Sequence, residues 1–321
     1  MTDTLKIVFM GTPEFAVPSL EALIENGYDV VGVITQPDRP AGRGNKLEAG
    51  PVKKCAMAHG IPVYQFEKLR RREGRECLEA LAPDICVTAA FGQLLSQKLL
   101  DIPKIGTVNV HASLLPKHRG SAPVNWCLYQ GDKKTGITTM MTDIGLDTGD
   151  ILLREETDIL PGETAGELTE RLSHIGAGLL VETLRRIENG DCPREKQDED
   201  EATYEPMLEK EMARIDWTLP AQTVSDRIRA FNPWPGAFTD MNGGTMKIWK
   251  AEPADISLAG RPGEVLVSSA RQGFIAACGD GTALNVLEMQ APNAKRMAAR
   301  AYLAGKQIPA GTVLGGEHDA E

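Results

Sequence analysis

The sequence predicts an α/β protein in which a parallel-sheet domain is followed by a small β-barrel or sandwich. Three observations lead to this prediction. Short apolar runs alternate with helix-like stretches through the first half of the chain, and these runs are continuously apolar, as in strands buried on both faces. In the C-terminal third, short β-like runs follow one another with turn residues between them, a pattern typical of a small antiparallel barrel or sandwich.

The first half opens with the apolar run 5–10 (LKIVFM), which predicts a buried strand that ends in the turn 11–13 (GTP). Apolar residues then recur at helical spacing up to Gly27, which is a helix stop signal. Residues 36–51 are rich in proline, glycine and charge, and they predict a long exposed loop. Further strands are expected at 30–35, 61–64, 84–89 and 107–111, and further helices at 52–59 and 68–81. Strands alternating with helices in this way predict a parallel sheet with helices on both faces.

The second half begins with a predicted hairpin, residues 136–143 and 150–155, and a long helix at 164–188. Residues 191–211 are acidic and polar with few large apolar side chains, which is typical of a linker. After a helix at 221–230, β-like runs are expected at 246–251, 263–267, 273–277 and 283–289, and an OB-like barrel is one candidate for them. The chain therefore divides into an N-terminal domain (1–190), an acidic linker (191–211) and a C-terminal domain (212–321).

The composition is that of a soluble globular protein, with 42% hydrophobic and 25% charged residues. No apolar run approaches the roughly 20 residues that span a bilayer, and the first residues lack the pattern of a signal peptide, so a cytoplasmic location with no membrane partner is expected. The six cysteines are scattered without a C-x-x-C pair, which favours reduced, buried thiols over a disulfide framework or a metal site. The net charge of −10 neither supports nor excludes nucleic-acid binding.

The most polar strand end is that of residues 107–111 (TVNVH). Asn109 and His111 are two residues apart, so their side chains point to the same face of the predicted sheet. Ligand sites of parallel sheets lie at the carboxyl ends of strands. An isolated histidine here would most simply be a core residue paired with a carbonyl. An amide and an imidazole on one face instead favour a functional site, because burying both costs several kcal/mol unless every group is hydrogen-bonded.

A carboxylate is needed beside such a histidine to set its tautomer or to relay a proton. The loop 145–150 (GLDTGD) offers Asp147 and Asp150, although the same residues are also the ones that turns prefer. Next to the strand of Asn109 and His111, we interpret Asp147 as the functional carboxylate. No serine elbow, metalloprotease motif, phosphate-binding loop or dinucleotide fingerprint follows a predicted strand, so an NAD site is disfavoured. The site is suited to proton transfer and oxyanion stabilisation around a bound acyl donor.

Several motifs together resemble the folate-dependent formyltransferases. They are Asn109-Val-His111, the run Ser113-Leu114-Leu115-Pro116, Arg119-Gly120 and the loop 145–150. Two further segments, residues 35–44 (TQPDRPAGRG) and 231–235 (FNPWP), narrow the resemblance to those members that formylate methionyl-tRNA. The resemblance covers nearly the whole chain and is weakest after about residue 255.

This resemblance implies a Rossmann-like formyltransferase domain and an OB-like C-terminal domain that helps to hold tRNA. It implies 10-formyltetrahydrofolate as the formyl donor, methionyl initiator tRNA as the acceptor, and no metal, NAD or protein partner. The catalytic residues would be Asn109, His111 and Asp147, and Arg43 would contact the acceptor end of the tRNA. The folate site would be lined by Ser113, Leu114, Leu115 and Pro116.

Other functions stay open at this point. With water as the acceptor, the same three residues would give a formyltetrahydrofolate hydrolase, and with other amines a formyltransferase for purine precursors or sugar nucleotides. A non-catalytic folate- or nucleotide-binding module is a further alternative, although binding alone does not require Asn109, His111 and Asp147 together.

Overall fold

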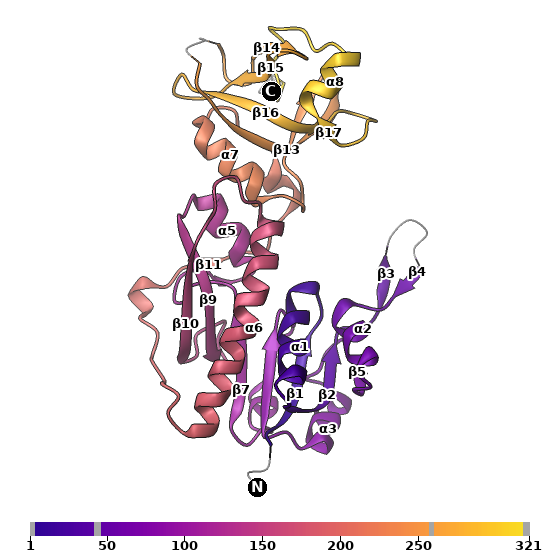
Figure 1. Ribbon diagram of the computed structural model, residues 1–321, viewed down its shortest axis with the longest axis vertical. Helices are drawn as coiled ribbons and strands as arrows, with labels where there is room; N and C mark the ends of the chain where they lie inside the picture. Colours follow the sequence, from indigo (N-terminus) through magenta and orange to yellow (C-terminus); the bar gives the residue numbers. More distant parts are fainter. Residues whose placement is uncertain (1–3, 42–45, 257–259, 317–321) are drawn as a thin grey trace. The chain divides into compact units, whose positions relative to one another are not determined.

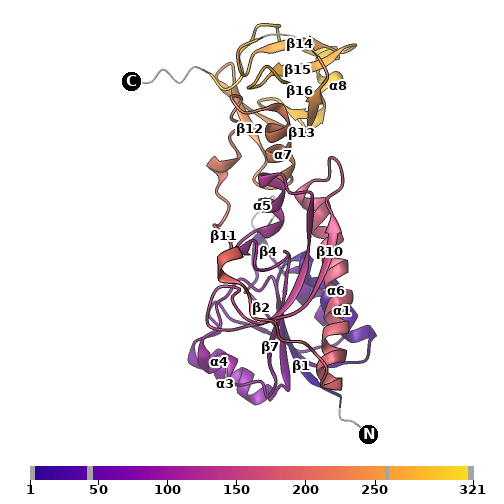
Figure 2. The same cartoon turned by 90° about the vertical axis from the view of Figure 1, so that its left-hand side faces the viewer.

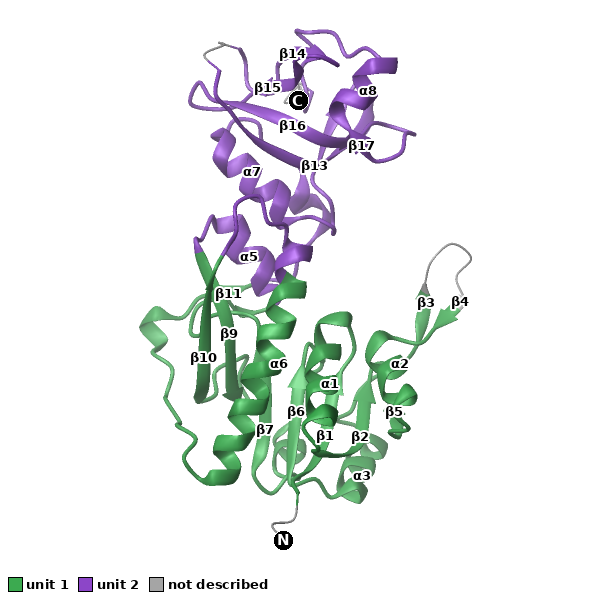
Figure 3. Cartoon of the chain, in the orientation of Figure 1, with its two compact units in different colours: residues 1–120, 134–158, 169–205 green, residues 121–133, 159–168, 206–321 purple. Residues whose placement is uncertain are grey.

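The computed structural model describes residues 4–41, 46–256 and 260–316, and it forms two compact units (Figure 3). Both units are discontinuous in the sequence, and each is described by itself. The contiguous division at 1–190, 191–211 and 212–321 stays a prediction. Unit 1 comprises residues 1–120, 134–158 and 169–205, and unit 2 comprises residues 121–133, 159–168 and 206–321.

Unit 1 is built on a seven-stranded mixed sheet (Figure 1) with the strand order β10-β9-β7-β6-β1-β2-β5. The strands from β7 to β5 are parallel, whereas β9 is antiparallel to both β7 and β10. The predicted parallel sheet and the predicted hairpin are thereby confirmed. The strands are β1 (Lys6–Gly11), β2 (Asp29–Thr35), β5 (Val63–Gln65), β6 (Ile85–Ala89), β7 (Gly106–His111), β9 (Lys134–Met141) and β10 (Ile151–Asp158).

Helices cover both faces of this sheet, as Figure 2 shows edge-on: α1 and α6 lie on one face, and α3 and α4 on the other. A buried apolar cluster that includes Val8, Met10, Leu78 and Leu99 fills the space between the sheet and α3 and α4. The apolar runs of the sequence therefore form strands because both of their faces are buried. The helical elements of unit 1 are η1 (Glu14–Ala16), α1 (Val17–Glu25), α2 (Pro51–Ala58), α3 (Arg72–Leu81), α4 (Gln97–Leu100) and most of α6 (Ala165–Asn189).

The predicted long loop at residues 36–51 is in part wrong. It contains a short antiparallel pair, β3 (Arg39–Ala41) and β4 (Lys46–Glu48). The sequence does not reveal this pair, because the segment is rich in proline and charge. A two-stranded ribbon without a buried face does not require apolar residues. At its base, the Gln65 amide donates to the Gln36 carbonyl at 2.9 Å, and the Lys53 ammonium pairs with an Asp38 carboxylate oxygen at 2.6 Å.

The first part of the predicted acidic linker is an ordered piece of unit 1. It contains the 3-10 helix η2 (Glu199–Glu201) and the strand β11 (Tyr204–Glu205), which pairs in parallel with β8 (Arg119–Gly120). Upstream, the backbones of Glu195 and Ile151 exchange two hydrogen bonds of 2.9 and 2.8 Å. Backbone hydrogen bonds therefore join residues 195–205 to the edge strand β10 and to the loop that follows β7.

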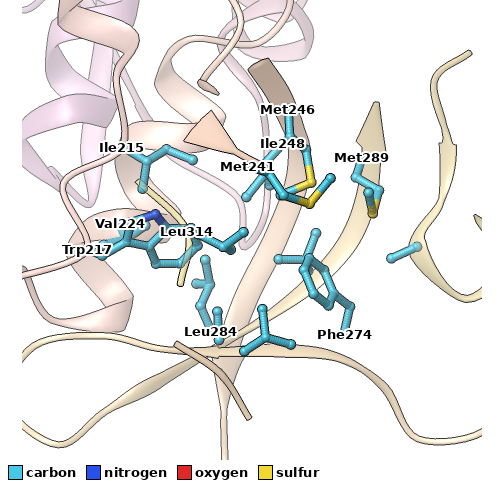
Figure 4. Close-up of a cluster of buried hydrophobic side chains, with 14 of the residues drawn as sticks. Ile215, Trp217, Val224, Met241, Met246, Ile248, Phe274, Leu284, Met289 and Leu314 are labelled. Carbon is cyan, nitrogen blue, oxygen red and sulfur yellow. The ribbon is translucent and has the colours of Figure 1, made fainter. Parts of the chain in front are cut away.

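Unit 2 contains an antiparallel sheet that curls around a buried core (Figure 4), in agreement with the predicted small barrel. The strand order is β12-β13-β16-β15-β14, and β17 pairs with β16. Trp217, Phe274, Leu284 and Leu314 are among the core side chains. The strands are β12 (Phe238–Met241), β13 (Gly244–Ala254), β14 (Val265–Ser269), β15 (Gly273–Ala277), β16 (Ala283–Gln290) and β17 (Met297–Ala298), and the helical elements are α5 (Pro123–Gln130), η3 (Lys210–Ala213), α7 (Ala221–Ala230) and α8 (Ala299–Gly305).

All six cysteines are free thiols, as predicted. Burial raises the pKa of Cys86 and of Cys278 to about 12, so these two thiols stay protonated and inert at neutral pH. Within the described ranges, none of the helices combines the length and the apolar character that crossing a membrane demands.

Two glycines of α6 give a test of how closely this helix packs on β7. A Cβ at Gly176 would lie 2.9 Å from Cγ1 of Val110, whereas a Cβ at Gly178 would meet nothing within 4 Å. We expect Gly176→Ala to lower the free energy of unfolding by about 1 kcal/mol, because the overlap with a stiff valine outweighs the gain in helix propensity. Gly178→Ala should raise it by about 0.5–1 kcal/mol. Chemical denaturation of the two variants measures both values, and equal shifts would contradict the close approach.

Candidate active site

The candidate site lies at the carboxyl end of β7, where the sheet changes from parallel to antiparallel pairing. Strand β7 is parallel to β6 on one side and antiparallel to β9 on the other. Asn109 is opposite Thr88 of β6, and His111 is opposite Thr138 of β9. Val110, which points to the other face, contacts α6 near Gly176. The face that carries Asn109 and His111 is therefore the one opposite α6.

Asn109 has a fixed side-chain orientation. The Thr88 hydroxyl donates to Asn109 Oδ1 at 2.8 Å, so the amide oxygen is the atom turned toward β6. Across residues 4–41, 46–256 and 260–316, no group accepts a hydrogen bond from Asn109 Nδ2. The half-buried side chain thus presents its N–H groups as donors for something that binds at the strand end.

His111 is buried, with 6% of its surface exposed. Its Nε2 lies 3.0 Å from the backbone carbonyl oxygen of His118. Because a carbonyl can only accept, we infer that Nε2 carries a proton and that Nδ1 is the nitrogen that gains or loses one. Nδ1 lies 3.7 Å from Oδ2 of Asp147, too far for a direct hydrogen bond. The histidine is therefore oriented by the His118 carbonyl and faces a carboxylate.

Asp147 reaches His111 because of the shape of its loop. The residue has φ of +54°, a left-handed conformation that aspartate tolerates better than most residues. Its Oδ2 accepts a hydrogen bond of 2.8 Å from the Gly120 N–H. Within the loop, Oδ1 of Asp143 accepts from the Gly145 N–H at 3.0 Å and from the Thr148 hydroxyl at 2.7 Å. The predicted turn and the predicted functional role are thus compatible, since this turn carries the carboxylate to the imidazole.

The run Ser113–Pro116 follows β7 directly and is anchored to β9. The Thr138 hydroxyl donates to the Ser113 carbonyl at 2.7 Å and accepts from the Leu115 N–H at 3.1 Å. The Leu115 side chain packs with two buried residues of the neighbouring strands, Met140 and Ile151. Ser113 is fully buried and its hydroxyl donates to the Lys117 carbonyl, whereas Leu114 is half-buried. A ligand at this run would meet the backbone and the Leu114 side chain rather than the serine hydroxyl.

Sequence reasoning missed the residues behind the site. His118 is buried and its Nδ1 lies 2.9 Å from Oε1 of Glu205, while Arg119, Gln197 and Glu199 form a connected polar group. Of these residues, only Arg119 is marked in the sequence, because it belongs to the motif Arg119-Gly120 that contributes to the family resemblance. The acidic residues after 190 look like a solvated linker in the sequence, because a contact across nearly eighty positions leaves no local periodicity.

Two other predictions concern what lies outside this group. Arg43 lies outside the described residues, so its contact with tRNA stays a prediction. Among the residues that are described, no cluster of three or more His, Cys, Asp or Glu side chains has the geometry to hold a metal ion.

The arrangement brings three different chemical abilities together in unit 1. Asn109 offers N–H donors, His111 offers a nitrogen that can carry a proton, and Asp147 offers a carboxylate that can accept one. Donors aimed at a developing oxyanion, together with an acid–base pair, are what acyl transfer to an amine requires. Asn109 and His111 are held on the end of a strand, and the loop of Asp147 is fixed to β8 by the hydrogen bond from Gly120, which favours a fixed geometry.

Residues 5–184 match the formyl transferase family model, and residues 207–307 match that of the formyl transferase C-terminal domain. The chain is 49% identical to the methionyl-tRNA formyltransferase of Geobacter sulfurreducens, over 97% of each protein. Among solved structures it is similar to WlaRD, a sugar 3N-formyl transferase studied in the presence of dTDP and 5-N-formyl-THF (TM-score 0.66, 20% identity, 90% of this chain and 98% of that chain). It is also similar to the methionyl-tRNA formyltransferase of Clostridium thermocellum (TM-score 0.55, 17% identity, 77% of this chain and 93% of that chain).

Two threonines of β9 test the anchoring of the run Ser113–Pro116. We expect Thr138→Val to lower the free energy of unfolding by about 1–3 kcal/mol, because it leaves the buried Leu115 N–H and Ser113 carbonyl without their partner. Thr135→Val is the matched control on the same strand. The Thr135 hydroxyl is buried and has no partner in the described part of the chain, so its loss should change the free energy by less than about 0.5 kcal/mol or stabilise the protein. Urea denaturation compares the two variants, and a neutral Thr138→Val would refute the anchor.

Proposed function

Because the chain belongs to the formyl transferase family, we propose that it transfers the formyl group of 10-formyltetrahydrofolate to the amino group of methionyl initiator tRNA. The product is N-formylmethionyl-tRNA, which serves the initiation of translation. The observation that carries this proposal is the convergence of Asn109, His111 and Asp147 at the end of β7. The acceptor is supported by relatives named methionyl-tRNA formyltransferase that align with nearly the whole chain.

The donor occupies the run Ser113–Pro116 with its formyl group toward Asn109 and His111. Two facts support this position. The run continues directly from the strand that carries both residues, and its backbone is anchored on β9. The similar fold of WlaRD was studied with a formylated folate, which supports a folate as the donor class.

In the first step, the neutral amine of the aminoacyl group attacks the formyl carbon, and the C=O π electrons move to oxygen. Asn109 Nδ2–H and the protonated Nδ1 of His111 stabilise this oxyanion. The nitrogen of the tetrahedral intermediate then loses a proton to Asp147, directly or through a water.

In the second step, the oxyanion re-forms the carbonyl and the bond from carbon to N10 of the folate breaks. The leaving N10 takes the electron pair of that bond and a proton from His111 Nδ1. Asp147, 3.7 Å from the same nitrogen, then returns a proton to the ring. The cycle moves one formyl group and one proton, and both residues end in their starting states.

The RNA is bound by Arg43 and by unit 2. In unit 2, cationic side chains lie over an aromatic ring: Arg296 and Lys247 are 4.7 and 5.3 Å from the ring of Trp249. Such groups suit phosphate and base contacts, and the binding should weaken as salt rises. The overall charge of −10 by itself gives no attraction for RNA, so binding has to rest on such local contacts.

The decisive experiment measures formyl transfer from 10-formyltetrahydrofolate to methionyl initiator tRNA, with free methionine and uncharged tRNA as controls. Product with the charged tRNA alone supports the proposal. Formyl release without any acylated tRNA would identify a hydrolase, and tight folate binding without turnover would identify a binding module.

Removing either donor should stop the reaction without unfolding the protein. We expect Asn109→Ala and His111→Ala each to lower kcat by at least about 100-fold, the loss typical of one oxyanion donor, with folate binding retained. His174→Ala is the control, because that histidine is exposed on α6. Single-turnover assays and circular dichroism measure the two effects, and near-normal turnover by either variant would refute the assignment.

Arg43→Ala should weaken RNA-dependent turnover far more than it weakens folate binding, because a lost positioning contact affects only the tRNA. Arg70→Ala serves as the control, since Arg70 is an exposed arginine of the same unit. Steady-state assays with varied tRNA and a folate-binding titration separate the two quantities. Equal losses in both would contradict the role of Arg43.

A further inference from the structure

Gln197 holds the main chain of the loop that carries Asp147. Its side-chain amide Nε2 donates two hydrogen bonds, to the carbonyl oxygens of Asp147 and Gly149, both at 2.8 Å. Its Oε1 accepts from Arg119 Nε at 3.0 Å. The amide therefore uses both N–H groups and its oxygen, and these partners allow only one orientation of the amide group.

Arg119 holds Gln197 in place. Its side chain has no exposed surface. The guanidinium forms a bidentate pair with Glu199, at 2.9 and 2.8 Å, and donates to the Tyr204 hydroxyl at 2.6 Å. The hydrogen bonds of this pair raise the pKa of Arg119 and lower the pKa of Glu199, so both groups stay charged. A buried arginine is costly unless its charge is paired and its donors have acceptors. Here the charge is paired with Glu199, and four of the five N–H groups donate hydrogen bonds.

The same short strand also holds the Asp147 carboxylate. Gly120, next to Arg119 in β8, donates its N–H to Asp147 Oδ2 at 2.8 Å. The backbone of β8 thus holds the Asp147 carboxylate through Gly120. The Arg119 side chain of β8 holds the main chain of the Asp147 loop indirectly, through Gln197. Asp147 needs external support, because a left-handed residue other than glycine costs of order 1–3 kcal/mol unless its surroundings fix it.

We propose that Arg119 and Gln197 form a clamp that fixes the Asp147 loop in its reactive geometry, and that both are positioning residues for formyl transfer. This inference rests on the proposed function for its kinetic consequence, but its structural part is independent of it. The acidic segment after residue 190 is then a part of the active-site support. Two hydrogen bonds join it to the loop, and a hydrogen bond and an ion pair join it to Arg119.

The clamp predicts a loss in kcat with little change in KM. Loosening the loop changes the distance from Asp147 to His111, and a misplacement near 1 Å costs about 100-fold in rate. Because neither Arg119 nor Gln197 lies in the run that holds the donor, folate affinity should stay within about twofold, as expected when only transition-state interactions are lost.

Gln197→Glu separates the clamp from a merely structural role. The glutamate keeps the size of the side chain and an acceptor for Arg119, but it has no N–H to donate, and its charge faces two carbonyl oxygens. Gln197→Ala removes the whole group. Lys196→Ala is the matched control, because its side chain is exposed in the same segment.

The test measures kcat, KM for both substrates, and hydrogen exchange of the amides at residues 142–150 and at Gly120. We expect both Gln197 variants to lose about 10–100-fold in kcat and to exchange these amides faster, while Lys196→Ala behaves as the unaltered protein. If Gln197→Glu keeps normal kcat, or if exchange in the loop is unchanged, the clamp is refuted. If the unaltered protein transfers no formyl group, the proposed function fails, and hydrogen exchange alone decides whether the clamp exists.

Discussion

The site depends on one hydrogen bond, from His111 Nε2–H to the backbone carbonyl of His118. It decides which imidazole nitrogen carries the fixed proton and turns the other toward Asp147. His118 is itself held in a left-handed conformation, with φ of +58°, by a hydrogen bond from its N–H to the Thr203 hydroxyl. A segment far along the chain therefore sets the tautomer of a strand residue, and the rest of the site is arranged around that nitrogen.

Much of this could be predicted from the sequence, for identifiable reasons. The polar pair Asn109 and His111 stands out because it interrupts a strand that ought to be apolar, and the two-residue period puts both on one face. Asp147 lies in a turn whose residue types are common in loops, and only its partners distinguish it. Gln197 could not be predicted at all. A single glutamine among acidic residues looks the same in the sequence whether its amide is solvated or donates hydrogen bonds to two backbone carbonyls.

The two units show why local patterns predict folds better than boundaries. The helix α7 was predicted with its observed limits, Ala221–Ala230, because its apolar spacing is local. The strand β12, Phe238–Met241, was missed, since its four residues mix polar and apolar side chains and acquire a strand conformation only by pairing with β13. The discontinuity of the two units could not be predicted for a similar reason. It depends on contacts between distant residues and not on local composition.

The ordered segment 195–205 also has a consequence for how such a protein can change by recombination. It supports the histidine and the aspartate of unit 1, yet its sequence has the character of a spacer. In a chimera of two related proteins with its junction at residue 190, the site of one parent would be supported by segment 195–205 of the other parent. With the junction after Glu205, the site and segment 195–205 would come from the same parent. We therefore expect the viable junctions of chimeras to cluster beyond Glu205, where the composition alone gives no reason to draw the border.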